Sequence, residues 1–224
     1  MRRLLRLACV LGSATLWAGC GVVIFKADFQ GASGSPAGSP PGPPSGDQIV
    51  VQDPANPVVS ASRLVFHPPQ EKAFFFSSPV QDPEATKTVF WIGRLKTGDG
   101  PFVFLVSADD TPGSIFLTNP MELRFSNNEV KVIGLPPGNA VLHSHSLVPN
   151  EEHRVFISLR PKSATYRMTI QQSGAAEIVF TGNLDPLTAN WIKSKSRIVL
   201  EAGFLPNATG TDEYEMDEVI MRET

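Results

Sequence analysis

The sequence predicts an all-β protein, an antiparallel β-sandwich with at most one short helix. Segments rich in β-branched and aromatic residues recur about every 8 to 14 positions from residue 48 onward. Turn-forming sequences such as TGDG, SNN, LPPGN and QSGA separate these segments. Within many segments apolar and polar residues alternate, whereas the 3.6-residue period of an amphipathic helix is nearly absent. This combination is typical of sandwiches and barrels.

The first expected strand is residues 22 to 29, VVIFKADF, because its β-branched and aromatic content suits a sheet. Residues 31 to 46 then contain only Gly, Ala, Ser and Pro. Such a segment cannot bury enough apolar surface to fold, and its prolines donate no ladder hydrogen bonds. We therefore expect a Gly/Pro/Ser-rich loop within a domain that spans residues 22 to 224. The alternative is an unfolded leader that includes the first segment.

Further strands are expected in regular succession along the rest of the chain. In residues 153 to 160, Val155, Ile157 and Leu159 would share one buried face, as half-buried antiparallel strands do. One short helix is expected within residues 184 to 196, where Pro186 suits the first turn. The expected strands are residues 48 to 52, 58 to 67, 73 to 78, 86 to 95, 101 to 108, 114 to 118, 121 to 126, 129 to 135, 140 to 147, 153 to 160, 165 to 172, 176 to 182, 197 to 204 and 213 to 222.

The first 19 residues have the pattern of a secretory signal peptide. MRRLLR carries three arginines, and residues 7 to 19 contain no charged side chain. This apolar stretch is too short to cross about 30 Å of hydrocarbon, which requires about 20 residues. We therefore expect an exported protein from which residues 1 to 19 are removed.

The segment LWAGC resembles the lipobox of bacterial lipoproteins, in which a cysteine after small residues is lipidated and becomes the new N-terminus. Ala18 and Gly19 occupy the small positions, whereas Trp17 stands where the family usually has Leu. The resemblance implies lipidation of Cys20, with residues 20 and 21 as the anchored N-terminus. Gly21, in place of Asp, implies the outer membrane of a Gram-negative bacterium. A chance cysteine beside an ordinary cleavage site is the alternative.

The charge of the processed chain excludes one class of partner. Signal removal takes away three of the 19 basic residues, so 16 would face 22 acidic residues, a net charge of −6. The sequence contains no basic run and no basic stripe interleaved with aromatics. We therefore expect no nucleic-acid partner, and we expect membrane contact to come through the lipid. Cys9 would leave with the signal peptide, so no intrachain disulfide is expected.

The order of the segments resembles the concanavalin A-like, or laminin G-like, jelly roll of lectins, carbohydrate-binding modules and some polysaccharide-degrading enzymes. The likeness rests on FKADF, on the hairpin EEHRVFISLRPKSATYRMTIQQ followed by IVFTGNL, and on the last segment EYEMDEVIMRE. It covers residues 22 to 224. It implies that the first and last strands lie side by side.

The same resemblance implies two sites on the last strand. Many such jelly rolls hold a structural calcium ion between the first and last strands, where Asp28 and Asp217 stand here. EYEMDE also resembles the E-x-D-x-E motif of jelly-roll endoglucanases and laminarinases. Read from Glu215, however, the third carboxylate is replaced by Val219. An acidic, solvent-facing strand is the simpler interpretation, and no residue is assigned to catalysis.

Two further groups are candidates for binding. His143 and His145 would share one face of a strand, and with His153 from the next strand they would supply three imidazoles for Zn²⁺. A polar stretch on a solvated strand is the simpler interpretation. Trp191 lies in the polar segment TANWIKSKS, so we expect an exposed ring that can stack on a sugar.

These observations favour a cell-envelope lipoprotein that acts as a non-catalytic binding or scaffold module, with a polysaccharide or an envelope protein as partner. One alternative is a structural component of an envelope protein assembly. The other is a polysaccharide lyase or hydrolase that uses the acidic residues or the three histidines. The sequence names no ligand.

Overall fold

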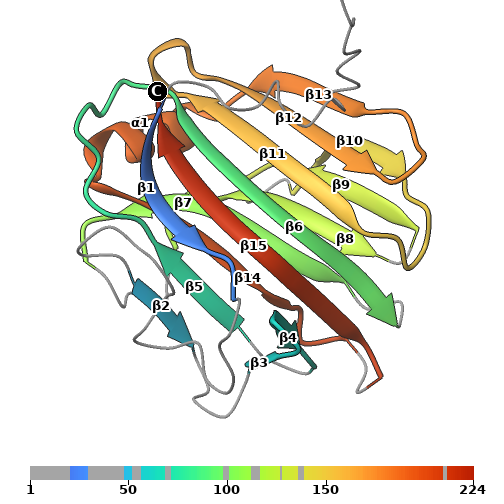
Figure 1. Cartoon of the computed structure of the whole chain (residues 1–224). Coiled ribbons are helices and arrows are strands. Elements are labelled where there is room, and N and C mark those ends of the chain that lie inside the picture. Colours follow the sequence, from blue (N-terminus) through green and yellow to red (C-terminus); the bar gives the residue numbers. More distant parts are fainter. Residues whose placement is uncertain are drawn as a thin grey trace, which may run out of the picture.

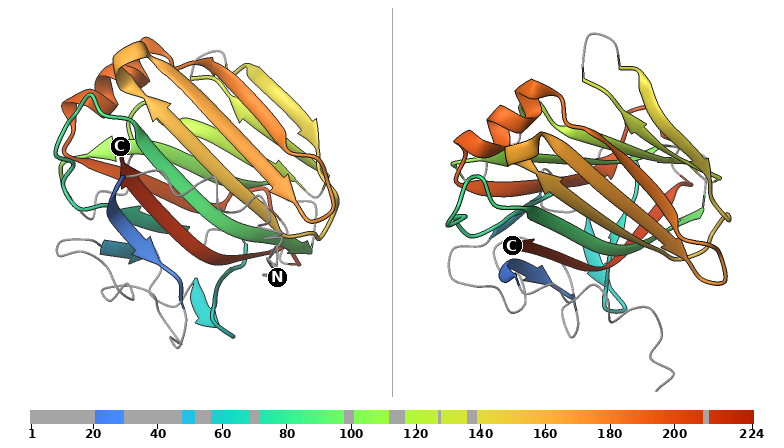
Figure 2. Two further views of the ribbon diagram at one scale, coloured as in Figure 1. Left: turned by 45° about the horizontal axis from the view of Figure 1, so that its top comes forward. Right: turned by 90° about the horizontal axis from the view of Figure 1, so that it is seen from above.

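The structure is a computed structural model, and it describes residues 21–29, 48–51, 57–68, 72–97, 101–111, 117–126, 128–135, 139–208 and 211–224. The expected signal peptide, Cys20 and the loop at residues 31 to 46 lie outside these ranges. Within them, two antiparallel β-sheets lie face to face (Figures 1 and 2). The fold is therefore the expected β-sandwich jelly roll.

In the described ranges the larger sheet has eight strands and contains both the first and the last of them. The first, β1, pairs with the last, β15, as the resemblance implied. In order across the sheet the strands are β13 (Ile178–Asn183), β12 (Thr165–Gln172), β11 (His153–Arg160), β6 (Lys87–Thr97), β15 (Glu213–Glu223), β4 (Arg63–Phe66) and β3 (Val58–Ser60), with β1 (Val22–Ala27) also on β15.

The smaller sheet is built from seven strands of the described residues and covers the inner face of the larger one (Figure 2). Its order is β10 (Val141–Ser146), β9 (Glu129–Ile133), β8 (Met121–Ser126), β7 (Phe102–Asp109), β14 (Arg197–Phe204), β5 (Lys72–Phe76) and β2 (Gln48–Val51).

The helical elements are short and lie within the connections between strands. Helix α1 (Pro186–Ser194) begins with Pro186 in its first turn, as expected, and the Asp185 side chain accepts a hydrogen bond from the Leu187 backbone. A 3₁₀ turn, η2 (Pro161–Ser163), joins β11 to β12. No helix of the described ranges is long and apolar enough to span a bilayer.

A segment that we expected to form one strand forms two strands in the structure. Residues 58 to 67 form β3 and β4, because Ala61 and Ser62 adopt left-handed backbone angles with φ of 50° and 63° and turn the chain back on itself. Residues 112 to 116, most of another expected strand, lie outside the described ranges. The other expected strands match observed ones to within a few residues at their ends.

Aromatic side chains from both sheets fill the core. Tyr214 of β15 stacks on Phe102 of β7 with ring centroids 4.0 Å apart, and Trp91 of β6 stacks on Phe104 at 4.2 Å. Gly93 makes this packing possible, since a Cβ there would lie 2.2 Å from the Tyr214 hydroxyl oxygen. The core therefore fixes β6, β15 and β7 relative to one another, and the candidate site lies on the opposite, outer face of β6 and β15.

Candidate functional site

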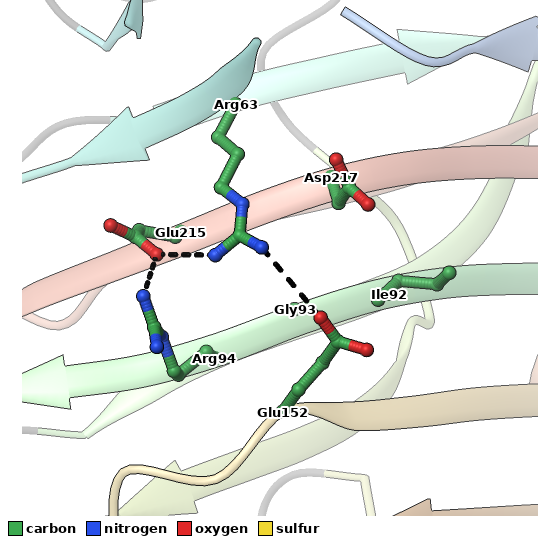
Figure 3. A pocket seen from close by; sticks show the side chains of 7 residues that line it. All are labelled: Arg63, Ile92, Gly93, Arg94, Glu152, Glu215 and Asp217. Carbon is green, nitrogen blue, oxygen red and sulfur yellow. Dashed lines mark hydrogen bonds and ion pairs between the residues drawn. The ribbon is translucent and has the colours of Figure 1, made fainter. Parts of the chain in front are cut away.

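Neighbouring strands of the larger sheet bring charged side chains together on its outer face (Figure 3). Arg63 comes from β4, Glu215 and Asp217 from β15, and Arg94 from β6, while Glu152 directly precedes β11. The depression that they form is shallow and encloses essentially no volume. It is lined by Arg63, Ile92, Gly93, Arg94, Glu152, Glu215 and Asp217, and we call it the arginine pocket.

Glu215 is the centre of the ion pairs in the arginine pocket. Its Oε2 accepts hydrogen bonds from Arg94 at 2.5 Å and from Arg63 at 2.8 Å. Lys96 Nζ lies 3.2 Å from the other carboxylate oxygen. The second guanidinium nitrogen of Arg63 lies 3.7 Å from Glu152. Three cations from two strands therefore hold one carboxylate of a third strand.

The electrostatics keep Glu215 ionised. Burial alone would raise the pKa of the Glu215 carboxyl, but the hydrogen bonds from Arg94, Arg63 and Lys96 outweigh it and lower that pKa to about 2. The Glu215 side chain is 11% exposed, so it is not the solvent-facing acid that its position on the last strand suggested. It orients the two arginines and is not available as a proton donor near neutral pH.

A β-bulge directs Asp217 into the same pocket. Met216 pairs with Gly93 and Glu218 with Ile92, so Asp217 is an extra residue on β15 without an opposite residue on β6. Its carboxylate makes no hydrogen bond or ion pair within the described residues and lies beside Arg63 (Figure 3). The pocket thus combines oriented donors from arginine with a free acceptor.

A second pocket lies beside the ends of β6, β8 and β12 and the start of β11. It encloses only about 10 Å³ and contains His153, which is 2% exposed. His153 Nε2 is 2.6 Å from the Tyr214 hydroxyl, and its ring stacks on Phe125. Burial lowers the pKa of His153 to about 3, so the imidazole is neutral at physiological pH. This pocket, the histidine pocket, is lined by Leu95, Phe125, Ser126, Leu147, Val148, Asn150, Glu151, His153 and Gln172.

The three histidines considered for zinc have different neighbours. His143 and His145 both contact the Phe180 ring, with centroids 5.0 and 6.5 Å away, whereas His153 is buried against Phe125 and Tyr214. Among the residues that the structure describes, no three His, Cys, Asp or Glu side chains are grouped to hold a metal ion. Zinc coordination by this trio has no geometric support here.

The two residues considered for calcium lie at the junction of β1 and β15. Asp28 and Glu218 each lie 3.7 Å from Lys26 Nζ, and Asp217 lines the arginine pocket. Calcium requires six to eight oxygen ligands, and an ammonium group already balances two of these carboxylates. The described donor set is therefore a poor fit, and the calcium site at Asp28 and Asp217 stays a prediction.

Trp191 is less exposed than we expected. Its ring packs on the main core, its Nε1 donates a hydrogen bond to the Ala108 carbonyl at 2.7 Å, and Lys195 Nζ lies 4.5 Å from its ring centroid. Lys195 also pairs with Asp110 at 2.8 Å. These contacts hold α1 against β7. A stacking role for Trp191 toward a sugar stays a prediction.

The chain shares its fold with legume lectins. Lectin II from Ulex europaeus superposes with a TM-score of 0.56 at 14% identity, covering 79% of this chain and 92% of the lectin. Arcelin-5 from Phaseolus vulgaris superposes with a TM-score of 0.54 at 12% identity, covering 81% of this chain and 94% of arcelin-5. The Bauhinia forficata lectin superposes with a TM-score of 0.58 at 10% identity, covering 91% of this chain and 98% of the lectin. No family model and no curated protein matches the sequence. At these identities the likeness concerns the fold.

Sequence reasoning placed two residues of the arginine pocket, Glu215 and Asp217, on one strand but missed the others. Arg63, Arg94 and Glu152 lie on distant segments that only the sheet order brings together. The alternation of RLVF and of WIGRL gave a weak signal, since it directs Arg63 and Arg94 away from the core. Nothing in the sequence pairs them with Glu215.

Proposed function

We propose that this chain is a non-catalytic carbohydrate-binding module of a bacterial cell envelope, held at the outer membrane by a lipid on Cys20. The lectin fold carries the proposal. Several of the similar structures hold a sugar, among them lectin UEA-II with galactose and the Bauhinia forficata lectin with GalNAc. The lipobox-like segment before Gly21 supports the membrane attachment.

The arginine pocket has the chemistry that sugar hydroxyls require. Each hydroxyl both donates and accepts hydrogen bonds, so a site that orients it needs donors and acceptors together. Arg63 and Arg94 supply guanidinium donors held in place by Glu215, and Asp217 supplies a free carboxylate acceptor. Ile92 adds apolar surface for the carbon face of a sugar ring. We assign carbohydrate contact to this pocket.

The size of the pocket predicts weak binding by a single copy. The depression encloses essentially no volume, far below the roughly 300 to 1,000 Å³ of pockets that enclose a drug-sized ligand, so it would contact only one edge of a sugar. Linked copies on a membrane can bind a polysaccharide far more tightly, because the second contact is intramolecular. The ligand expected is therefore a repetitive polysaccharide.

The state of Glu215 disfavours the hydrolase alternative for this pocket. Glycoside hydrolysis requires one carboxylic acid that is protonated near neutral pH and a second carboxylate. Glu215 is ionised and paired with three cations, and its pKa of about 2 opposes proton donation. A binding role requires no proton transfer and fits this arrangement.

The test is binding of the exported chain, displayed in many copies, to an array of envelope and capsular polysaccharides. Asp217→Asn removes the free acceptor charge with little change in shape, and it should reduce binding to the preferred glycan at least several-fold. Glu177→Gln is the matched control, because Glu177 is an exposed carboxylate at a distant turn and pairs with Arg167 only loosely at 3.9 Å. It should bind as the unaltered chain does.

A third variant separates the two candidate surfaces. Trp191→Phe keeps an aromatic core contact but loses the hydrogen bond to Ala108. If a folded Trp191→Phe chain lost glycan binding while the Asp217→Asn chain kept it, the glycan site would lie at α1 instead of in the arginine pocket. The absence of binding to any polysaccharide would contradict the proposed function itself.

A further inference from the structure

The residue after Cys20 is already packed in the sandwich. A Cβ at Gly21 would lie 2.7 Å from the Glu223 carbonyl oxygen and 2.3 Å from Thr224 Cγ2, so Gly21 is in close contact with the end of β15. Thr224 is itself fixed to Thr86, since each backbone N–H of the pair donates to the other's carbonyl, at 2.9 and 3.0 Å. Consecutive Cα atoms are about 3.8 Å apart, so a lipid on Cys20 would have no flexible spacer before the fold.

This contact defines which end of the sandwich adjoins Cys20. β15 runs antiparallel to β1 and to β6, so Val22, Glu223 and Lys87 lie in one row. Lys87 pairs with Leu159, near the end of β11, and η2 follows that strand directly. Helix α1 lies against η2 and follows β13. We call this end, formed by Gly21, Thr86, η2, α1 and Thr224, the Gly21 end (Figure 1).

Exposed side chains at the Gly21 end suit contact with lipid headgroups. Leu187 on α1 is 61% exposed and Val22 is 54% exposed. The Lys162 side chain on η2 is 79% exposed. Long cationic chains and isolated apolar chains are the types found where proteins meet the polar layer of a bilayer.

Both pockets lie toward the opposite end of the strands. Arg94 of the arginine pocket pairs with Glu215, near the end of β6 that is far from Lys87. In the histidine pocket, Leu95 pairs with Tyr214 and His153 with Gly93, also near that end. Strand β12 runs from the Gly21 end to the opposite end of the sandwich, and its eight residues extend over roughly 26 Å.

From this geometry we infer that the Gly21 end rests on the lipid headgroup surface and that both pockets lie in the half of the sandwich farther from the membrane. The inference rests on the lipid attachment in the proposed function. It adds an orientation: the sandwich stands with its strands directed away from the bilayer, and the pockets are presented to ligands beyond the membrane surface.

Two serine-to-cysteine variants test the orientation. Ser163→Cys lies in η2 just before β12, and Ser173→Cys lies just after β12, so the two positions flank the same strand, and both are exposed. Because Cys9 would be removed and Cys20 lipidated, each variant has one free thiol for a fluorescent label. The labelled lipoproteins are reconstituted in vesicles of a zwitterionic phospholipid, with or without a small fraction of lipid that carries a nitroxide on its headgroup.

The nitroxide quenches only nearby fluorophores, so the label at residue 163 should be quenched several-fold more than the label at residue 173. Equal quenching, or stronger quenching at residue 173, in protein that floats with the vesicles would overturn the orientation and leave the lipid anchor standing. Failure of the unaltered chain to float with vesicles would overturn both the anchor and the orientation. A Cys20→Ser chain is the control and should stay off the vesicles.

Discussion

His153 is a buried histidine that the fold holds in its neutral form. Its pKa of about 3 lies below the value of about 6.5 in an unfolded chain, because burial penalises the imidazolium. Between these values the unfolded chain binds a proton that the native chain does not, so stability is fully present above pH 6.5 and falls as the pH decreases toward 3.

The first prediction concerns this acid sensitivity. The unaltered chain should lose about 2 kcal/mol of unfolding free energy from His153 between pH 7 and pH 5. His153→Gln can still hydrogen-bond to Tyr214 but does not titrate, so its stability should change much less over that range. Urea unfolding at several pH values measures the difference. If the two chains lost the same stability between pH 7 and pH 5, His153 would not be the source of the acid sensitivity.

Residue 93 is glycine because the Tyr214 side chain leaves no space for a Cβ, not because the backbone angles require it. A methyl group at residue 93 would lie 2.2 Å from the Tyr214 hydroxyl and 2.7 Å from its ring, and Tyr214 is completely buried. The second prediction is that Gly93→Ala costs about 1 to 3 kcal/mol through overpacking. Gly93→Ala combined with Tyr214→Phe removes the closest clash and should recover part of that loss. If Gly93→Ala were as stable as the unaltered chain, the described core packing would be wrong.

At the scale of the elements, a buried ion pair fastens the last strand. Lys87 of β6 is completely buried, and its ammonium donates to Glu223 of β15 at 3.2 Å. Glu223 also accepts hydrogen bonds from the backbone N–H groups of Gln81 and Asp82, at 2.7 and 2.5 Å. The pair therefore joins β6, β15 and the loop between β5 and β6.

The third prediction follows because loss of Glu223 and loss of Lys87 leave different groups behind in the buried pair. Glu223→Gln leaves a buried ammonium without its counter-charge and should cost about 3 to 5 kcal/mol. Lys87→Met removes the buried cation and leaves Glu223 with its two backbone donors, so it should cost less. Denaturant unfolding of the two variants gives the comparison. A larger loss for Lys87→Met would show that the ammonium stabilises the fold more than the burial argument allows.

The elements themselves were largely predictable from local sequence. Strand alternation placed β11 and β12 correctly, because side-chain direction follows the period of two. Pro186 located the start of α1. The turn at Ala61 and Ser62 was missed, since neither residue is typical of left-handed backbone. The bulge at Asp217 was also missed, since only pairing with β6 reveals an extra residue.

At the scale of the whole molecule, the arginine pocket depends on sheet order, which local sequence does not specify. Glu215 was visible as an acid on the last strand, but its partners Arg63 and Arg94 lie 152 and 121 residues away. Jelly-roll topology places β4 and β6 on either side of β15. The resemblance to the concanavalin A-like fold predicted the sandwich, but its motifs do not contain these arginines.

The fourth prediction is that Glu215→Gln weakens glycan binding, although the Glu215 side chain does not itself contact the ligand. Without the carboxylate, Arg63 and Arg94 lose the acceptor that orients them and lie close together with like charge. Affinity should therefore fall, and stability should fall by about 1 to 3 kcal/mol, between the values for exposed and buried ion pairs. Calorimetry with the preferred polysaccharide and urea unfolding check the two effects.

The most direct test of the account is to map the glycan contact by NMR. The exported chain with Cys20→Ser, labelled with ¹⁵N, is titrated with fragments of the polysaccharide that it prefers on the array. We predict amide shifts concentrated around Arg63, Arg94, Glu152 and Asp217, with smaller changes in α1. Shifts confined to another surface would contradict the assignment of the pocket, and no shifts with any envelope polysaccharide would contradict carbohydrate binding.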